Sequence, residues 1–397
     1  MSLPVNSLRP DKPGKIANFI LFVFLMLLIL GISLFVYLKS MNVDIRTVSF
    51  KEICDLIFMN NSIITPEKSI GKIDLDVKEA NSVITYGDLL VKCTSDILKA
   101  FNEKGEELWS HQLSIGNPRM KTSGKDLLVY DLGGKQIYIL NGKEMKWSKT
   151  LDASILYADI NIKGNVSVVH EVEGYKGGVT VYDPDGGEMF TRAIANNFPV
   201  CAKVSPDGKF IAINTVDTSG VKAASSIEFT DSLGKPCAAA RNIKADKLFP
   251  GMWFLKNGVL AVSDTDLVFV DEKGNEKWKK DFTDRRLESS KIVSGDQVVA
   301  AISKGGSAGA QTTDMKIFDS EGKEIHSFGV DKKVWAVNTC ENMISINTGR
   351  DAFFYNVKGK LKGKFSTKTD ITDILFFNSR EAAVVTKSDI NVVKTGE

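Results

Sequence analysis

The sequence predicts an all-β fold: a single β-propeller of four-stranded blades, preceded by one N-terminal transmembrane helix. Three observations carry this prediction: a strand–turn–strand unit that recurs along the chain, strands without helical periodicity between them, and one uncharged apolar segment near the start. Repeats of about 40 residues with four short strands each are typical of propeller blades. The 397 residues are therefore expected to form one large repetitive body rather than two ordinary domains.

The first element is a run of 23 residues without a charge, at residues 16–38. A helix that rises about 1.5 Å per residue would span roughly 35 Å over this run, enough to cross a hydrocarbon core of about 30 Å. The run is longer than the apolar region of a signal peptide, and no small-residue cleavage site follows it. We therefore expect an uncleaved signal anchor at 16–38, after a short basic tail at 1–15.

The basic residues that flank this helix do not decide its orientation in the membrane. Three basic residues lie on each side of it: Arg9, Lys12 and Lys15 before it, and Lys39, Arg46 and Lys51 after it. The positive-inside count is close to a tie, and the short tail favours a cytoplasmic N-terminus. We expect a single-pass protein of the cell membrane whose propeller is extracytoplasmic.

Residues 39–71 are expected to hold a juxtamembrane amphipathic helix and a linker. Ser49 and Glu52 have the spacing of a capping box. Apolar residues then recur at helical spacing: Phe50, Ile53, Cys54, Ile57 and Phe58. Whether this helix packs under the propeller, lies on the membrane or faces a partner helix stays open.

The repeat that defines the body of the protein contains a hairpin turn of the form Asx-x-x-Gly. Seven turns, 37 to 48 residues apart, begin at Asn102, Asn141, Asp183, Asp231, Asp271, Asp319 and Asn356. All but the tighter Asn-Gly turn at Asn141 carry glycine three positions later. The Asp or Asn side chain can bond the backbone two residues on, and glycine accepts the positive φ that closes the hairpin.

Two further apolar runs precede each hairpin, which makes four strands per unit. In the unit that ends at Phe282 the expected strands are Met252–Leu255, Val259–Ser263, Leu267–Asp271 and Glu276–Lys280.

The two ends of the chain favour eight blades, with seven as the alternative. Three more expected strands follow the seventh turn, at 371–377, 382–386 and 390–393. Residues Gly71–Val77 resemble a strand that follows a turn, and they supply the fourth strand of this last blade. Splitting one blade between the termini closes the ring without a free edge. The propeller is then expected over residues 72–397.

Two of the units carry a known pattern. The runs ILKAFNEKGEELW (97–109) and LVFVDEKGNEKW (267–278) resemble the quinoprotein (PQQ-type) propeller repeat, in which a Trp wedges between neighbouring blades. The matching residues are Trp109, Trp147 and Trp278, with Phe190 in the third unit. The turn Ser205–Lys209 also resembles those of WD40-like propellers. This superfamily includes enzymes, envelope-assembly scaffolds and uncharacterised membrane-anchored bacterial proteins, so the resemblance implies the fold and leaves the activity open.

The sequence predicts no catalytic residue, no cofactor and no metal site. The quinone-dependent enzymes of the resembled superfamily use an adjacent Cys-Cys pair, which this chain lacks. Cys201 and Cys237 are expected on the first and fourth strands of one blade, too far apart for a disulfide. The three histidines fall in separate units, which argues against a histidine-based triad or metal site. These observations favour a protein without enzymatic activity, and they leave an enzyme open as the alternative.

Charge is balanced over the body of the protein. The chain has 51 basic and 49 acidic residues, and the excess of two lies within residues 1–15. Nucleic-acid binding draws its affinity from a basic surface, so a neutral propeller argues against nucleic acid as a partner. Other proteins of the cell envelope are the expected partners.

Candidate interaction residues lie between the second and third strands of three units, where the connections are longer than elsewhere: 171–178, 217–224 and 303–313. These connections share one face of a propeller, and function tends to lie in loops on a rigid scaffold. The alternative is that their length reflects neutral sequence change at the surface and has no function. The candidates are Tyr175, Lys176, Asp217, Thr218, Lys304, Gly305, Gly306, Ser307 and Gln311. Trp253 and Trp335 are candidates to stack a ligand in the central funnel, with packing between blades as the alternative.

These features favour a membrane-anchored extracytoplasmic propeller that acts as a non-enzymatic protein-interaction scaffold in the bacterial cell envelope. The alternative is a carbohydrate- or small-molecule-binding propeller, an enzyme or a sensor, with its site in the central funnel. The sequence leaves the partner, the ligand and the oligomeric state open.

Overall fold

The computed structural model describes residues 22–26, 28–29, 31–33, 69–74, 82–237, 241–244, 247–304 and 312–396. The chain divides into two compact units, Met1–Ile64 and Thr65–Glu397. The described residues of the first unit are helical. A search of the described residues finds no helix long and apolar enough to cross a membrane. Much of the expected anchor at 16–38, and the expected helix after Ser49, lie outside the described residues.

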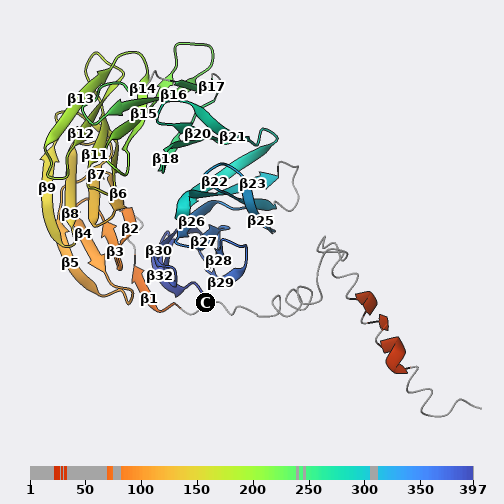
Figure 1. Cartoon of the computed structure of the whole chain (residues 1–397). Helices are drawn as coiled ribbons and strands as arrows, with labels where there is room; N and C mark the ends of the chain where they lie inside the picture. The colour runs from red at the N-terminus through yellow and green to blue at the C-terminus, as the bar shows by residue number, and fades with distance from the viewer. Residues whose placement is uncertain are drawn as a thin grey trace, which may run out of the picture. The chain divides into compact units, whose positions relative to one another are not determined.

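The second unit consists of eight four-stranded antiparallel sheets arranged as the blades of a propeller (Figure 1). Blade 1 contains β2 (Ser82–Tyr86), β3 (Leu89–Cys93), β4 (Ile97–Phe101) and β5 (Glu107–Gln112), and blade 2 contains β6 (Pro118–Ser123), β7 (Asp126–Asp131), β8 (Gln136–Asn141) and β9 (Glu144–Thr150). Blade 3 contains β10 (Ile155–Ile160), β11 (Val166–His170), β12 (Gly177–Tyr182) and β13 (Glu188–Ile194). Blade 4 contains β14 (Phe198–Val204), β15 (Phe210–Asp217), β16 (Ala224–Asp231) and β17 (Arg241–Lys244).

Blade 5 contains β18 (Gly251–Leu255), β19 (Gly258–Val262), β20 (Asp266–Asp271) and β21 (Glu276–Asp281). Blade 6 contains β22 (Arg285–Val293), β23 (Gln297–Lys304), β24 (Thr313–Phe318) and β25 (Glu324–Val330), with a short 3-10 turn at Ser294–Asp296. Blade 7 contains β26 (Ala336–Cys340), β27 (Met343–Asn347), β28 (Asp351–Asn356) and β29 (Leu361–Ser366). Blade 8 contains β30 (Ile371–Asn378), β31 (Glu381–Thr386), β32 (Asp389–Lys394) and β1 (Gly71–Asp74).

Blade 8 is split between the two ends of the propeller, as the sequence predicts. Strand β1 pairs antiparallel with β32, with Ile73 opposite Ile390. In Figure 1 the orange β1 therefore lies beside the blue C-terminal strands. The predicted eight-bladed propeller closed by N- and C-terminal strands is confirmed.

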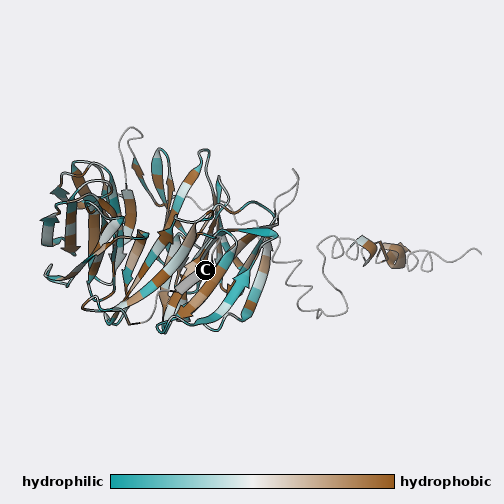
Figure 2. Ribbon diagram, turned by 90° about the horizontal axis from the view of Figure 1, so that it is seen from above, coloured by the Kyte–Doolittle hydropathy of each residue, from teal (hydrophilic) through white to brown (hydrophobic). Residues whose placement is uncertain are grey.

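Among the described residues, eight hydrophobic cores hold the ring together, one at each junction between neighbouring blades. Strand β20 shows how the sequence produces this arrangement. Leu267 and Phe269 pack toward blade 6, while Val268 and Val270 pack toward blade 4. Side chains alternate between the two faces of a strand, and both faces are buried, so the four central residues of the strand are all apolar. Figure 2 shows apolar and polar segments distributed over all the blades.

The Asx-x-x-Gly turns form as expected. In blade 6, Asp319 Oδ1 accepts hydrogen bonds from the amides of Glu321 (3.0 Å) and Lys323 (2.8 Å), and Gly322 has a φ of 79°. The same pair of bonds forms at five other turns, those of Asn102, Asp183, Asp231, Asp271 and Asn356. One side chain therefore satisfies two backbone donors in each of six blades.

Two of the tryptophans that match the resembled quinoprotein repeat connect one blade to the next. The indole Nε1–H of Trp147 in blade 2 donates to the carbonyl oxygen of Pro184 in blade 3, at 3.1 Å. That of Trp278 in blade 5 donates to the carbonyl oxygen of Ser320 in blade 6, at 2.9 Å. Each indole covers the turn glycine of the next blade.

In two other blades phenylalanine takes this place. Phe190 of blade 3 lies against Gly234, where an added Cβ would come within 2.8 Å of its ring. Phe328 of blade 6 lies against Gly359 in the same way. These four junctions therefore use one geometry, an aromatic ring over a glycine, with either of two ring types.

Blade 4 differs from the expected pattern at its outer edge. Cys237 lies in the exposed segment between β16 and β17, and the expectation that it lies on the fourth strand is wrong. Pro236 next to it has no amide hydrogen and forms only an isolated bridge with Thr230. The fourth strand starts later, at Arg241, and pairs with Ser225–Ile227.

Candidate functional site

The connections between second and third strands leave each blade at the same end as the connections to the next blade, because the four strands alternate in direction. We call this end the loop face, and the end with the Asx turns the turn face. Tyr175 and Lys176 lie on the loop face between β11 and β12, and Asp217 and Thr218 lie at the end of β15. Lys304 ends β23. The other predicted loop residues, Gly305, Gly306, Ser307 and Gln311, lie outside the described residues.

Two adjoining cavities open around the connection between β11 and β12. Their volumes are about 770 and 630 Å³. Both are lined by Asp152, Ala153, Glu171, Val172 and Glu173. We call the two together the blade 3 groove; it lies between β9 of blade 2 and the sheet of blade 3 and reaches β14 of blade 4.

The smaller cavity of the groove is lined by exposed apolar side chains. Leu156 is 41% exposed, Tyr175 52% and Phe198 41%. The Lys176 ammonium lies 4.7 Å from the centroid of the Phe198 ring. Large apolar side chains that gather at one cavity of a rigid surface are typical of a contact site.

The larger cavity is acidic. Four carboxylates line it, those of Asp152, Glu171, Glu173 and Glu188, and the only lysine among its lining residues is Lys149. Within the described part of the chain the first three carboxylates form no salt bridge. The cavity therefore has carboxylates available for a cationic group.

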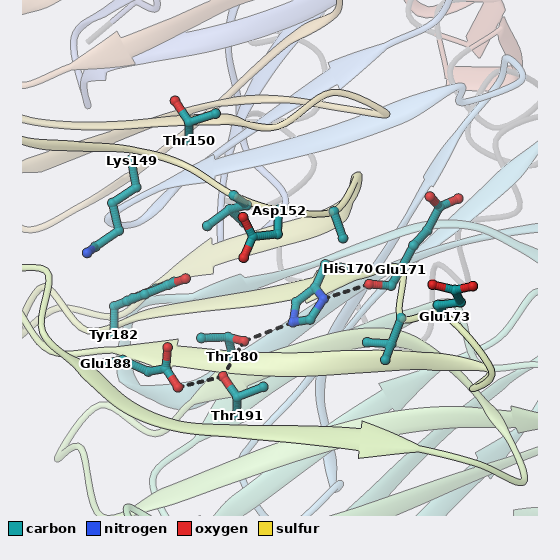
Figure 3. A pocket seen from close by; sticks show the side chains of 13 residues that line it. Lys149, Thr150, Asp152, His170, Glu171, Glu173, Thr180, Tyr182, Glu188 and Thr191 are labelled. Carbon is teal, nitrogen blue, oxygen red and sulfur yellow. Dashed lines mark hydrogen bonds between the residues drawn. The ribbon is translucent and has the colours of Figure 1, made fainter.

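A chain of hydrogen bonds crosses the wall of this cavity (Figure 3). The Thr191 hydroxyl donates to the Glu188 carboxylate at 2.8 Å, so the Thr180 hydroxyl, 2.7 Å away, must donate to Thr191. Thr180 then accepts from His170 Nε2, at 2.8 Å. His170 Nδ1 lies 2.9 Å from the Glu171 carbonyl oxygen, which can only accept. These bonds connect His170 with Glu188 through the two threonines.

The second candidate site is the central channel, a cavity of about 500 Å³ among the innermost strands. Residues of six blades line it, including Ile84, Lys121, Asp159, Lys203, Trp253 and Lys291. Lys121 of β6 and Lys203 of β14 each donate to one oxygen of Asp159 on β10, both at 2.7 Å. This ion triad links blades 2, 3 and 4 across the channel wall.

Burial and charge shift the titration of the groups in the channel. Burial lowers the pKa of Lys121 to about 8, and the neighbouring Lys203 adds to this shift. Burial opposes ionisation of Asp159, but the two lysines outweigh it and hold its pKa below the ordinary value. Burial also raises the pKa of Cys201 to about 11 and that of Tyr157 above its usual range. Cys201 and Tyr157 therefore stay neutral at neutral pH.

The two tryptophans proposed for the funnel lie in different places. Trp253 on β18 lines the central channel. Trp335 lies between β25 and β26 on the loop face, 58% exposed, with the Lys333 ammonium 3.9 Å from its ring centroid. The structure therefore places one of the pair in the channel and the other at the surface.

The described residues contain no cluster of three or more His, Cys, Asp or Glu side chains that could hold a metal ion. His111, His170 and His326 lie on β5, β11 and β25, in three different blades. Sequence reasoning missed the groove carboxylates and the channel triad. The one sequence signal for the triad is the spacing of its members, since Lys121, Asp159 and Lys203 lie about one repeat apart on first strands.

A family model described as "Family of unknown function (DUF5711)" matches residues 61–395. No curated protein matches the chain.

Solved structures of propellers are similar to the chain in fold. BamB from Moraxella catarrhalis is 14% identical, with a TM-score of 0.52, over 83% of this chain and 99% of that one. The C-terminal WD40 domain of Sif2 is 13% identical, with a TM-score of 0.63, over 85% and 100%. Sqt1 from Chaetomium thermophilum is 10% identical, with a TM-score of 0.58, over 83% and 99%. These likenesses show the β-propeller fold alone. The family model spans most of the sequence, so the chain belongs to the DUF5711 family.

Proposed function

We propose that this protein is a non-enzymatic scaffold, anchored in the cell membrane by residues 16–38, whose propeller binds partner proteins of the bacterial cell envelope. The observation that carries the proposal is the blade 3 groove, where exposed apolar side chains adjoin carboxylates that have no salt bridge within the described residues. The fold supports it, because a closed ring of blades holds its loops on a rigid frame. The resemblance to propellers that include BamB and WD40 domains is consistent with a scaffold.

The apolar end of the groove supplies the anchor points. Tyr175 and Phe198 come from two different blades and line one cavity. Aromatic side chains that a partner can cover completely carry much of the energy of a protein interface. A partner that covers Phe198 would also bury Leu156, which lines the same cavity.

The acidic end of the groove defines the chemistry of the partner. The carboxylates of Asp152, Glu171 and Glu173 line the larger cavity and lack lysine or arginine partners among the described residues. A partner segment with a basic side chain next to an apolar one would meet both ends of the groove. Complementary charges of this kind contribute more to the choice of partner and to its orientation than to the affinity.

Membrane attachment is part of the proposal. Its support is the 23-residue uncharged run at 16–38, which is long enough to span a bilayer as a helix. In the proposed orientation the N-terminus is cytoplasmic and the propeller lies outside the cytoplasm.

Site-specific photo-crosslinking in intact cells tests the scaffold. A crosslinker at Phe198 is expected to capture a defined envelope protein, whereas one at Leu233, an exposed residue of a blade 4 turn, is expected to capture none. Glu173→Lys should abolish the capture, and Glu321→Lys on the turn face should leave it unchanged. Equal capture from both positions, or capture that survives Glu173→Lys, would contradict the assignment of the groove.

Protease treatment of intact cells tests the location. A propeller outside the cytoplasm is digested, and deletion of residues 16–38 prevents recovery of the chain with the membrane fraction. A propeller protected from protease in intact cells would overturn the proposed orientation.

The alternative function is a small-molecule-binding propeller. One observation favours it: the channel cavity of about 500 Å³, which has Trp253 in its wall. This volume lies within the range of ordinary ligand pockets, about 300–1,000 Å³.

A further inference from the structure

The central channel carries more positive than negative charge. Three of its lining residues are lysines from alternate blades: Lys121 of blade 2, Lys203 of blade 4 and Lys291 of blade 6. The only carboxylate among the lining residues is that of Asp159. With Cys201 and Tyr157 neutral, these side chains leave an excess of two positive charges when all three lysines are protonated.

Asp159 cannot balance a further lysine. Its two carboxylate oxygens are each occupied by one ammonium group, Lys121 on Oδ1 and Lys203 on Oδ2. Lys291 lines the same cavity from the opposite side of the ring and has no salt bridge with any described residue. A buried or half-buried cation is costly unless a counter-charge reaches it.

We propose that the central channel is a binding site for a small multivalent oxyanion, a phosphate or a polycarboxylate, held by Lys291 together with Lys203 and Lys121. The lysines approach from three sides of the cavity, so one anion with several oxygens can accept hydrogen bonds from more than one of them. Trp253 and Tyr157 supply apolar walls that limit solvent around the anion. The bonds to Asp159 hold Lys121 and Lys203 in place, which reduces the entropy lost on binding.

This inference rests on the small-molecule function of the channel and is independent of the blade 3 groove. Loss of partner capture at Phe198 would leave the channel site intact, and a channel without affinity for anions would leave the scaffold intact. The two proposals therefore fail separately.

Isothermal titration of the purified full chain tests the site with three probes: inorganic phosphate, pyrophosphate and citrate, with chloride at matched ionic strength as the reference. We expect saturable binding of one anion per chain. Lys291→Met should weaken it by about tenfold to a hundredfold, the loss expected for one charge-assisted hydrogen bond. Lys358→Met, at an exposed position of the blade 7 turn, should bind as the native chain does.

The pattern of results identifies the class of ligand. Preference for phosphate and pyrophosphate assigns a phosphoryl ligand, and preference for citrate assigns a polycarboxylate. A rise in thermal midpoint with the bound anion, absent in Lys291→Met, shows that the folded chain is the species that binds. No saturable binding in the millimolar range, or equal binding by Lys291→Met and the native chain, would overturn the proposal.

Discussion

The indole of Trp278 in blade 5 lies directly against Gly322 in the turn of blade 6. A Cβ added to Gly322 would come within 2.6 Å of Trp278 Cδ2, a distance that real contacts do not reach. The indole Nε1–H also donates to the carbonyl oxygen of Ser320 in the same turn. The glycine of the repeat therefore has two roles: it accepts the positive φ of the turn, and it leaves room for the ring of the preceding blade.

Gly322→Ala is expected to lose about 2–4 kcal/mol of unfolding free energy, because it combines a strained left-handed backbone with a forced contact at Trp278. Gly142→Ala is the matched control. Gly142 also has a positive φ, of 60°, but no atom lies within 4 Å of its added Cβ, so its loss should be about 1–2 kcal/mol. Urea unfolding of both variants measures the difference. Equal losses would show that the indole moves aside without cost.

Ile73→Asp is expected to open the ring at blade 8. Ile73 is buried in the core formed with Phe377 and Val392, and an unpaired carboxylate there costs at least about 3 kcal/mol. The control is Lys72→Ala, which removes ion pairs of an exposed lysine with Asp74 and Asp389 and should leave the thermal midpoint nearly unchanged. Thermal unfolding followed by circular dichroism separates the two outcomes. A wild-type midpoint for Ile73→Asp would mean that β1 is dispensable.

Asp319→Ala should lose about 1–3 kcal/mol, since two backbone amides of the blade 6 turn lose their acceptor. Asp319→Asn should retain nearly full stability. The chain itself supplies the precedent, because Asn102 and Asn356 accept the same two bonds in blades 1 and 7. If the two variants unfold at the same urea concentration, the side-chain acceptor does not stabilise the turn.

The lowered pKa of Lys121 predicts that the unfolding free energy rises at alkaline pH. Its pKa in the folded chain is about 8, below the ordinary 10.5. Between these values the unfolded chain binds more protons than the folded chain, so the unfolding free energy rises with pH. Lys121→Met lacks this contribution. As the pH rises from about 8 to 10.5, the urea midpoint of the native chain should therefore increase relative to that of the variant. A constant difference would contradict the lowered pKa.

The outline of the fold was predictable because its determinants are local. An Asx side chain and a glycine three residues later define each hairpin within a few residues. Continuous apolar runs such as that of β20 show that both faces of a strand are buried. The three strands left at the C-terminus, together with Gly71–Asp74 at the other end, were sufficient to predict the split blade.

The expected site was predictable only in part. The length of the segment around Tyr175 pointed to the loop face of blade 3, and the structure places Tyr175 in a cavity there. Its role in binding stays a prediction. Nothing local to Tyr175 shows that Asp152, from the preceding connection, lines the same groove, because that proximity depends on how blade 2 packs against blade 3.

By itself the sequence determined the repeat, since its turns and strands depend on hydrogen bonding and apolar spacing over a few residues, and it favoured eight blades closed by strands from the two ends. Only the tertiary structure decided where charge gathers. Lys121, Asp159 and Lys203 come from three blades and meet because the ring brings the first strand of every blade to one axis. The same closure leaves Lys291 in that channel without a described counter-charge. A chain whose net charge is only +2 thereby acquires a local excess of positive charge at the centre of its propeller.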